Sequence, residues 1–127
     1  MQIWLHGNLD AHPFIPASFW TDHFEMVRDM LPQAELYVHE NEATRQIDGF
    51  IGLTENHIEG IFVAKAARSK GIGKALLEYA KSRKPRLTLG VYQKNERALA
   101  FYQREQFVVH SEGIDEDTNE AEIQMLW

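Results

Sequence analysis

The chain contains no cysteine. This absence excludes a disulfide scaffold, a cysteine nucleophile and a thiolate metal site. The sequence also has no apolar run of the length that a membrane helix needs, and its N-terminus has neither the basic start nor the long apolar stretch of a secretory signal. We therefore expect no membrane partner, and a cytoplasmic location fits these absences.

Basic residues are fewer than acidic residues. The net charge is −6 at pH 7, with 13 lysines and arginines against 19 aspartates and glutamates. This balance argues against a nucleic-acid partner, because such proteins must neutralise many phosphates. An anionic ligand would need a local basic patch, and the region from Lys65 to Lys74 supplies one. The remaining acidic surface favours a cationic partner, such as an amine or a lysine-rich segment.

The spacings typical of metal sites are missing as well. The six histidines are scattered, and none forms a His-x-x-x-His or His-Glu-x-x-His pair. The acidic segment Asp115–Asn119 lacks the glycine and the terminal glutamate of a calcium loop. We therefore expect no metal and interpret this segment as a solvated hairpin tip.

The 127 residues, 44% hydrophobic and 25% charged, are expected to form one globular domain, residues 1–127. After an irregular or briefly helical lead-in over Met1–Pro16, the hydrophobic pattern predicts a regular succession of elements. These are a helix from Ser18 to about Leu31, strands Glu35–Asn41, Gln46–Thr54 and His57–Ala64, helix Ile72–Arg83, strand Leu87–Val91, helix Glu96–Glu105 capped by Asn95, strand Phe107–His110, loop Glu112–Glu120 and strand Ala121–Trp127. The order predicts an α/β fold with a mixed sheet and helices on both faces.

The most informative stretch follows the central strand. Gly71 and Gly73 stand between that strand and the helix Ile72–Arg83. A strand, a glycine turn and a helix direct several backbone N–H groups to one place, where the helix dipole also favours an anion of the phosphate type. The pattern fits neither the dinucleotide fingerprint nor the P-loop. A nucleotide-binding domain is therefore the less favoured interpretation.

Two motifs carry a resemblance to a known family. Arg68, Gly71 and Gly73 resemble the Arg/Gln-x-x-Gly-x-Gly/Ala signature of the GCN5-related N-acetyltransferases (GNAT). The stretch from Asn95 through Ala98 to Phe101 and Tyr102 resembles that family's second signature, Asn-x-x-Ala-x-x-Phe-Tyr. The resemblance implies a mostly antiparallel sheet with a splayed central pair of parallel strands. It also implies acetyl-CoA as the co-substrate and direct attack by the amine of a small molecule or a protein.

The resemblance also implies where the cofactor binds. The pyrophosphate would lie on the loop from Arg68 to Lys74, contacted by backbone amides, and the pantetheine arm would pair with the backbone of Phe62 and Val63. The amide of Val63 would polarise the thioester carbonyl. The side chains of this strand are interpreted as plain core, because its backbone would do the binding. The implied cofactor-binding residues are Ile61, Phe62, Val63, Arg68, Ser69, Lys70, Gly71, Ile72, Gly73, Lys74, Asn95, Ala98 and Tyr102.

Catalysis by proton transfer is predicted for two side chains. By resemblance, Tyr102 would give a proton to the departing CoA thiolate, against the simpler interpretation as a core tyrosine. Glu59, on the central strand, is the best candidate for the general base, and an exposed strand carboxylate explains it equally well. His57 and Tyr92 are lesser candidates for the base. Three further residues, His12, Phe14 and Trp20, fall where relatives line the acceptor cleft, and loop and core packing is the favoured explanation for them.

The sequence departs from the family pattern in two respects. The usual opening strand and most of a helix are expected to be missing, so that the sheet is a strand short, the chain is truncated, or another chain pairs with the uncovered edge in a homodimer. Gln106 stands where the family has glycine at a left-handed helix end, which costs about 1 kcal/mol if that conformation is kept. These departures leave open a CoA-binding module with little or no catalysis.

Overall fold

The computed structural model describes residues 1–68 and 70–127. Two helices, α1 (Gln2–Ala11) and α2 (Ala17–Met30), lead through the short 3-10 helix η1 (Leu31–Gln33) into three consecutive strands. The elements that follow are β1 (Glu35–Glu40), β2 (Ile47–Thr54), β3 (His57–Val63), the 3-10 helix η2 (Lys65–Ala67), α3 (Ile72–Arg83), β4 (Thr88–Tyr92), α4 (Glu96–Arg104), β5 (Val108–Asp115) and β6 (Glu120–Leu126). The predicted α/β class is confirmed.

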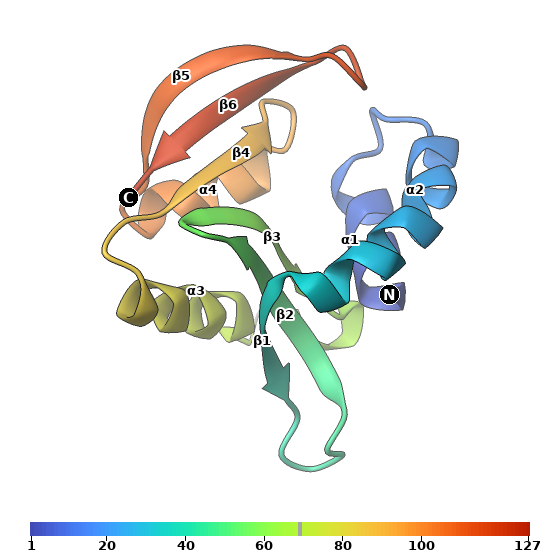
Figure 1. Ribbon diagram of the computed structural model, residues 1–127, viewed down its shortest axis with the longest axis vertical. Helices are drawn as coiled ribbons and strands as arrows, with labels where there is room; N and C mark the ends of the chain where they lie inside the picture. The colour runs from blue at the N-terminus through green and yellow to red at the C-terminus, as the bar shows by residue number, and fades with distance from the viewer. Residues whose placement is uncertain (69) are drawn as a thin grey trace.

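Within the described residues, six strands form one sheet in the order β1-β2-β3-β4-β6-β5. Only β3 and β4 are parallel, and the other neighbouring pairs are antiparallel. Figure 1 shows α1 and α2 on one side of the sheet, and α3 and α4 on the other. The predicted mixed, mostly antiparallel sheet with helices on both faces is therefore confirmed.

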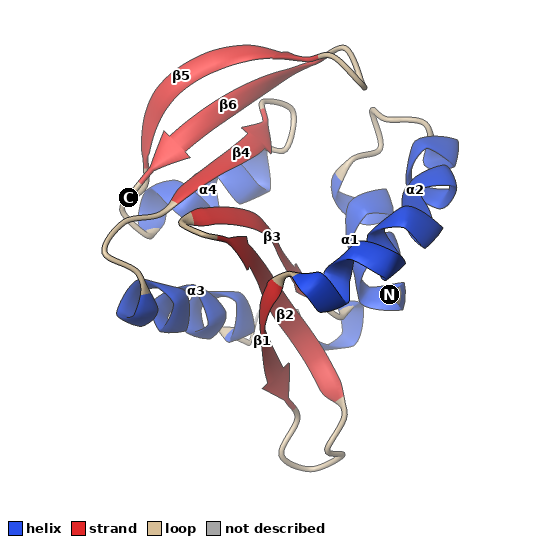
Figure 2. Cartoon of the chain, in the orientation of Figure 1, coloured by secondary structure: helices blue, strands red, loops and turns tan. Residues whose placement is uncertain are grey.

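The central parallel strands soon part from each other. β3 and β4 pair only at His57 with Thr88 and at Ile58 with Leu89. Beyond this point β3 continues to Val63 beside β2, and β4 continues to Tyr92 beside β6. Figure 2 shows the consequence, a sheet whose two halves diverge from a common line. The predicted splay of the central pair is present.

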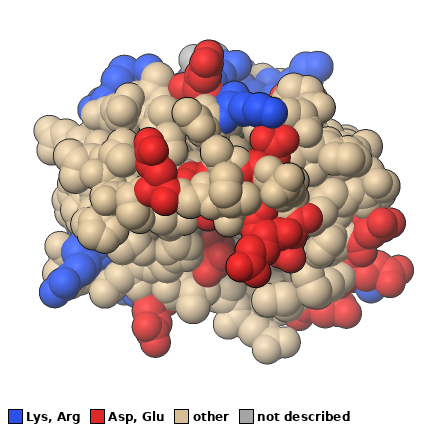
Figure 3. Space-filling model, turned by 90° about the horizontal axis from the view of Figure 1, so that it is seen from above, with Lys and Arg blue, Asp and Glu red and all other residues tan. Residues whose placement is uncertain are grey.

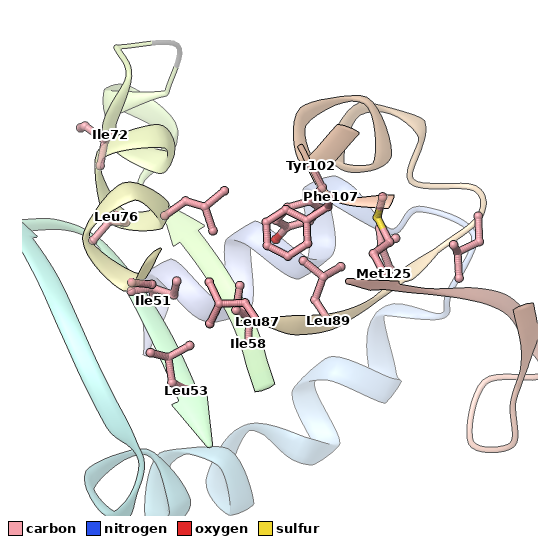
Figure 4. Packing of buried hydrophobic residues seen from close by; sticks show 14 of the residues in the cluster. Ile51, Leu53, Ile58, Ile72, Leu76, Leu87, Leu89, Tyr102, Phe107 and Met125 are labelled. Carbon is pink, nitrogen blue, oxygen red and sulfur yellow. The ribbon is translucent and has the colours of Figure 1, made fainter. Parts of the chain in front are cut away.

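A separate hydrophobic cluster fills each face of the sheet. The larger one joins α3 and α4 to the sheet, and its fully buried side chains include Ile51, Leu53, Leu89 and Met125 (Figure 4). The smaller one joins α1 and α2 to the sheet around Trp4, Ile15, Trp20 and Phe50. Both clusters depend on β3, because side chains of one strand alternate between the two faces.

The first helix is longer than the sequence pattern predicts. Residues 2–11 form α1, where a short helical or irregular lead-in is expected. A Cβ on Gly7 would lie only 3.2 Å from the Phe62 ring, so this position stays small. Asn8 is buried, and its side-chain amide donates to the Trp4 carbonyl at 2.9 Å. These two residues on the packed side of α1 interrupt the apolar periodicity.

The strand β5 is also longer than predicted. It extends to Asp115, where the loop Glu112–Glu120 is expected, and only residues 116–119 form the turn. β5 is an edge strand that is exposed along almost its whole length, and its register with β6 shifts between Val109 and Ser111. An edge strand with both faces in water needs no apolar alternation, so its sequence resembles a loop. The other boundaries agree with the prediction to within two residues.

The opposite edge of the sheet is β1, which pairs with β2 alone among the described residues. No strand precedes α1 in the described part of the chain, whereas the family pattern usually opens with one. Within the same residues, the structure has no helix of the length and apolar character that spanning a membrane requires.

The end of α4 keeps the left-handed turn despite its non-glycine residue. Gln106 has φ +74°, Phe107 N–H donates to the Tyr102 carbonyl at 2.9 Å, and Gln106 N–H donates to the Gln103 carbonyl at 3.1 Å. These two bonds form a Schellman motif, which normally has glycine at the left-handed position. The strain expected from the sequence is therefore present.

We predict that Gln106→Gly stabilises the protein by about 0.5–1 kcal/mol, because glycine adopts this φ without strain. The greater conformational entropy of glycine in the unfolded chain offsets only part of this stabilisation. Urea unfolding measures the difference. The control Gln103→Gly, inside the same helix, should be destabilising by a similar amount. A Gln106→Gly variant less stable than the wild type would contradict the assignment of strain to this residue.

Candidate active site

The N-terminus of α3 directs several unpaired amides toward solvent. Gly71 is its N-cap, with φ +79°, and its carbonyl accepts the first helical hydrogen bond from Ala75 N–H at 3.0 Å. The N–H groups of Ile72, Gly73 and Lys74 precede that bond and have no partner within the helix. These amides and the helix dipole suit an anion of the phosphate type.

The side chains of this loop divide between core and solvent. Ile72 is buried in the larger cluster, so its amide alone is available to a ligand. Lys70 and Lys74 are exposed and add positive charge. A Cβ on Gly73 would lie 3.7 Å from the Phe101 ring, an ordinary contact, so packing does not require glycine there. Close approach of a ligand to the backbone would require it. Ser69 lies outside the described residues.

Arg68 is engaged within the protein. Its Nε donates to the Val63 carbonyl at 3.1 Å, and its Nη1 pairs with Asp10 Oδ2 at 3.0 Å. The guanidinium therefore joins the end of β3 to α1 and stabilises the loop from within. Asp10 was missed by the sequence analysis, because nothing in a lone helical aspartate indicates a partner 58 residues away.

The backbone of β3 directs some of its N–H groups into the opening of the sheet. Ala64 N–H donates to the Asp48 carbonyl beyond the end of β2 at 2.8 Å. Peptide groups alternate in direction along an antiparallel strand. The Phe62 N–H therefore also points toward β2, and the N–H groups of Ile61 and Val63 point toward the diverging β4. The sequence leads us to expect that Phe62 and Val63 present their backbone to the pantetheine arm. In the structure the outward N–H groups belong to Ile61 and Val63, and not to Phe62.

Glu59 occupies a β-bulge at the point of divergence. Gly60 pairs with Gly52 and Ile58 pairs with Leu53, which leaves Glu59 as the extra residue of β3. It immediately follows Ile58, the last residue of β3 that pairs with β4, and its side chain is exposed. Bulges commonly redirect a side chain beside an active site.

Tyr102 is almost completely buried on α4. Its ring contacts those of Phe101 and Phe107 with centroids 5.2 and 5.6 Å away, and Figure 4 shows it beside Phe107 in the larger cluster. Burial raises the pKa of its phenol above the ordinary value. The hydroxyl is therefore protonated at neutral pH, the form that a general acid needs.

Asn95 joins α4 to the connection between α1 and α2. Its Oδ1 accepts Ala98 N–H at 3.3 Å, which confirms the predicted N-cap. Its Nδ2 therefore faces His12 Nε2, also at 3.3 Å, and donates to it. The His12 ring stacks on Trp20 and meets Tyr92 edge to face.

His12 is held neutral in this cluster. Burial lowers its pKa from 6.5 to about 4. As an acceptor from Asn95 it bears its proton on Nδ1, which is buried and has no partner among the described residues. His12, Phe14 and Trp20 thus form packing contacts, as the favoured sequence interpretation had it.

The two lesser candidates for a base are both engaged with neighbours. Tyr92 donates its phenol proton to Asp115 Oδ2 at 2.7 Å, and burial together with this bond raises the phenol pKa. His57 Nδ1 lies 2.8 Å from Thr88 Oγ1. In the described part of the chain, no group of three histidines, aspartates or glutamates is arranged to hold a metal ion.

Comparison with known proteins agrees with this geometry. Residues 32–109 match the model of the acetyltransferase (GNAT) domain. The chain is 36% identical to the peptidyl-lysine N-acetyltransferase YiaC of Escherichia coli (strain K12), over 100% of this chain and 87% of YiaC. It is also 36% identical to the peptidyl-lysine N-acetyltransferase YjaB of the same strain, over 86% of this chain and 74% of YjaB.

Solved structures give the same result. The solution structure of apo YjaB from Escherichia coli superimposes with a TM-score of 0.86 at 31% identity, covering 99% of this chain and 86% of that one. A putative streptothricin acetyltransferase from Bacillus anthracis, solved with acetyl coenzyme A, has a TM-score of 0.65 at 27% identity, covering 74% and 62%.

We predict that part of the stability of the protein is lost between about pH 6.5 and pH 4, the window set by His12. The folded-state pKa is the lower one, so the unfolded chain binds a proton there that the native state does not, and stability falls as the pH falls. Urea unfolding at several pH values measures this dependence.

The comparison that isolates His12 uses two variants. His12→Gln should show a flatter dependence across this window than the wild type. His6→Gln, exposed on α1, serves as the matched control and should follow the wild type. If His12→Gln and the wild type fall in parallel, His12 is not the group responsible.

Proposed function

The chain belongs to the GNAT family and is an acetyl-CoA-dependent N-acetyltransferase, and we propose that it acetylates the side-chain amine of lysine in a peptide or protein. The 36% identity to YiaC over the whole chain is the observation that carries this proposal. YjaB, named for the same acceptor, supports it at equal identity.

The loop before α3 is the proposed pyrophosphate site. The amides of Ser69 through Lys74 would donate to the phosphate oxygens, and the exposed Lys70 and Lys74 would add charge. Gly71 supplies the left-handed N-cap, and Gly73 leaves its backbone open to close approach. Arg68 would act by fixing the end of β3, since its guanidinium is bound to Val63 and Asp10.

The divergence of β3 and β4 is the proposed site of the pantetheine arm and the thioester. The outward backbone groups of Ile61 would pair with the arm much as a strand accepts an added peptide, whereas the Val63 carbonyl already accepts from Arg68. The Val63 N–H would donate to the thioester carbonyl oxygen and stabilise the negative charge that forms on it. Asn95 and Ala98 would contact the cofactor from the start of α4, as the family motif implies.

Two side chains are proposed to move protons. Glu59, in the bulge, would accept a proton from the acceptor ammonium directly or through water, because a lysine amine is protonated at neutral pH. The free amine nitrogen then bonds to the carbonyl carbon, the carbon–sulfur bond breaks, and the nitrogen releases its second proton through water. Tyr102 would give its phenol proton to the departing sulfur, and the proton that the nitrogen releases would restore the phenol.

The charge of the surface is consistent with a lysine acceptor. On the face shown in Figure 3, carboxylates stand near the middle, and the lysine and arginine side chains lie mostly toward the margin. This face carries β5 and β6. An acidic surface attracts a cationic segment and raises its rate of association.

Two expectations from the sequence stay predictions. The free edge of β1 is where a second copy of the chain would add a strand, and light scattering would report the resulting dimer. A cytoplasmic location is the other.

The acceptor is tested with matched peptides. One contains a single lysine and a blocked α-amine, and the other has norleucine in place of lysine and a free α-amine. We expect the higher kcat/KM with the first peptide, in an assay that follows CoA release. Preference for the free α-amine, or for a small amine over both peptides, would contradict a lysine acceptor.

For Tyr102→Phe we predict a loss of turnover of about 100-fold or more with unchanged acetyl-CoA affinity, because a positioned general acid contributes this much and only its hydroxyl is removed. Steady-state kinetics and calorimetric titration measure the two quantities. Tyr79→Phe, on the exposed side of α3, is the control and should retain full activity. Undiminished turnover in Tyr102→Phe would show that another group protonates the sulfur.

A further inference from the structure

One carboxylate lies against the backbone of β4 beside the opening of the sheet. A Cβ on Gly90 would come within 3.1 Å of Glu122 Cδ and 3.2 Å of Glu122 Oε1. The Gln124 side-chain amide donates to Glu122 Oε1 at 2.7 Å and lies over the same glycine. The missing side chain of Gly90 thus makes the space that the Glu122 carboxylate occupies.

This carboxylate is on the α1 and α2 side of the sheet. Ile123 and Met125 are buried in the cluster beneath α3 and α4, so Glu122 and Gln124 project from the opposite face of β6. The cross-strand partner of Glu122 is Tyr92, whose ring packs with the smaller cluster. The Glu122 side chain is half-buried, so solvent can reach it.

The register of the sheet brings Glu122 to the level of Glu59. Ile58 and Leu89 are the last paired residues of β3 and β4. The next residue is Glu59 on β3 and Gly90 on β4, and the Glu122 carboxylate covers Gly90. Glu59 on β3 and the Glu122 carboxylate, which reaches from β6 over β4, therefore lie at the same level of the sheet, where β3 and β4 part.

Glu122 lacks a cation. None of the ion pairs formed within the described residues includes it. By contrast Glu120, two residues earlier on the same strand, pairs with Lys94 at 3.1 Å. A half-buried carboxylate with one amide donor retains acceptor positions for a charged donor.

We propose that Glu122 binds the ammonium group of the acceptor amine, with Gln124 orienting the carboxylate, so that Glu122 selects cationic acceptors. The proposal rests on the proposed lysine acceptor and adds a residue that recognises it. Glu122 contributes to acceptor binding, and Glu59 remains the proposed proton acceptor.

The test is Glu122→Gln, which keeps the size of the side chain and removes its charge. With the single-lysine peptide we expect KM for the peptide to rise by roughly ten-fold or more, the effect of losing one charged hydrogen bond, and KM for acetyl-CoA to stay unchanged. Glu120→Gln is the matched control, and its peptide KM should stay within about two-fold of the wild-type value because Lys94 already neutralises that carboxylate.

A second acceptor separates charge from shape. In a peptide whose acceptor group is an alkoxyamine, the nitrogen is uncharged at pH 7. For this peptide the wild type and Glu122→Gln should have equal KM values. An unchanged lysine-peptide KM in Glu122→Gln, or an equal rise for both peptides, overturns the proposal. Failure of the lysine acceptor itself is distinguishable, because the wild type would then fail to acetylate the lysine peptide.

Discussion

The early parting of β3 and β4 is the constraint on which the rest of the structure depends. Two residue pairs join the halves of the sheet, and beyond them β3 has backbone groups that β4 no longer reaches. Backbone N–H groups in a folded protein need a partner in the protein, in water or in a ligand. The opening is therefore the proposed place for an extended ligand. It lies between the strand that ends at the glycine loop and the strand that leads into α4.

The opening is held by contacts between elements that flank it. Helices α1 and α2 pack on one face of the sheet and helices α3 and α4 on the other, with β3 contributing to both clusters. Two polar contacts link these layers. Arg68 ties the end of β3 to Asp10 on α1, and Asn95 ties the start of α4 to His12. Both residues come from the family motifs, so each motif stabilises the architecture in addition to its proposed ligand contacts.

Much of the fold and the cofactor side of the site could be predicted from the sequence, because these depend on local signals. Gly71 and Asn95 each mark the start of a helix through their own backbone or side chain. The prediction was wrong where tertiary contacts replace local pattern, as in α1 with its buried Asn8 and in the exposed edge strand β5. The position of Glu122 could not be foreseen, since it depends on the register of β6 against β4 and on the space above Gly90.

Amide hydrogen exchange of β3, measured by NMR with and without acetyl-CoA, tests most directly whether the cofactor binds in the opening of the sheet. The Phe62 amide faces β2 and should be protected in both states, whereas the amides of Ile61 and Val63 should become protected only when acetyl-CoA is bound. That result would establish that the cofactor pairs with the free edge of β3. Saturating acetyl-CoA that leaves the exchange of Ile61 and Val63 unchanged would contradict the account, because the cofactor would then bind elsewhere than in the opening of the sheet.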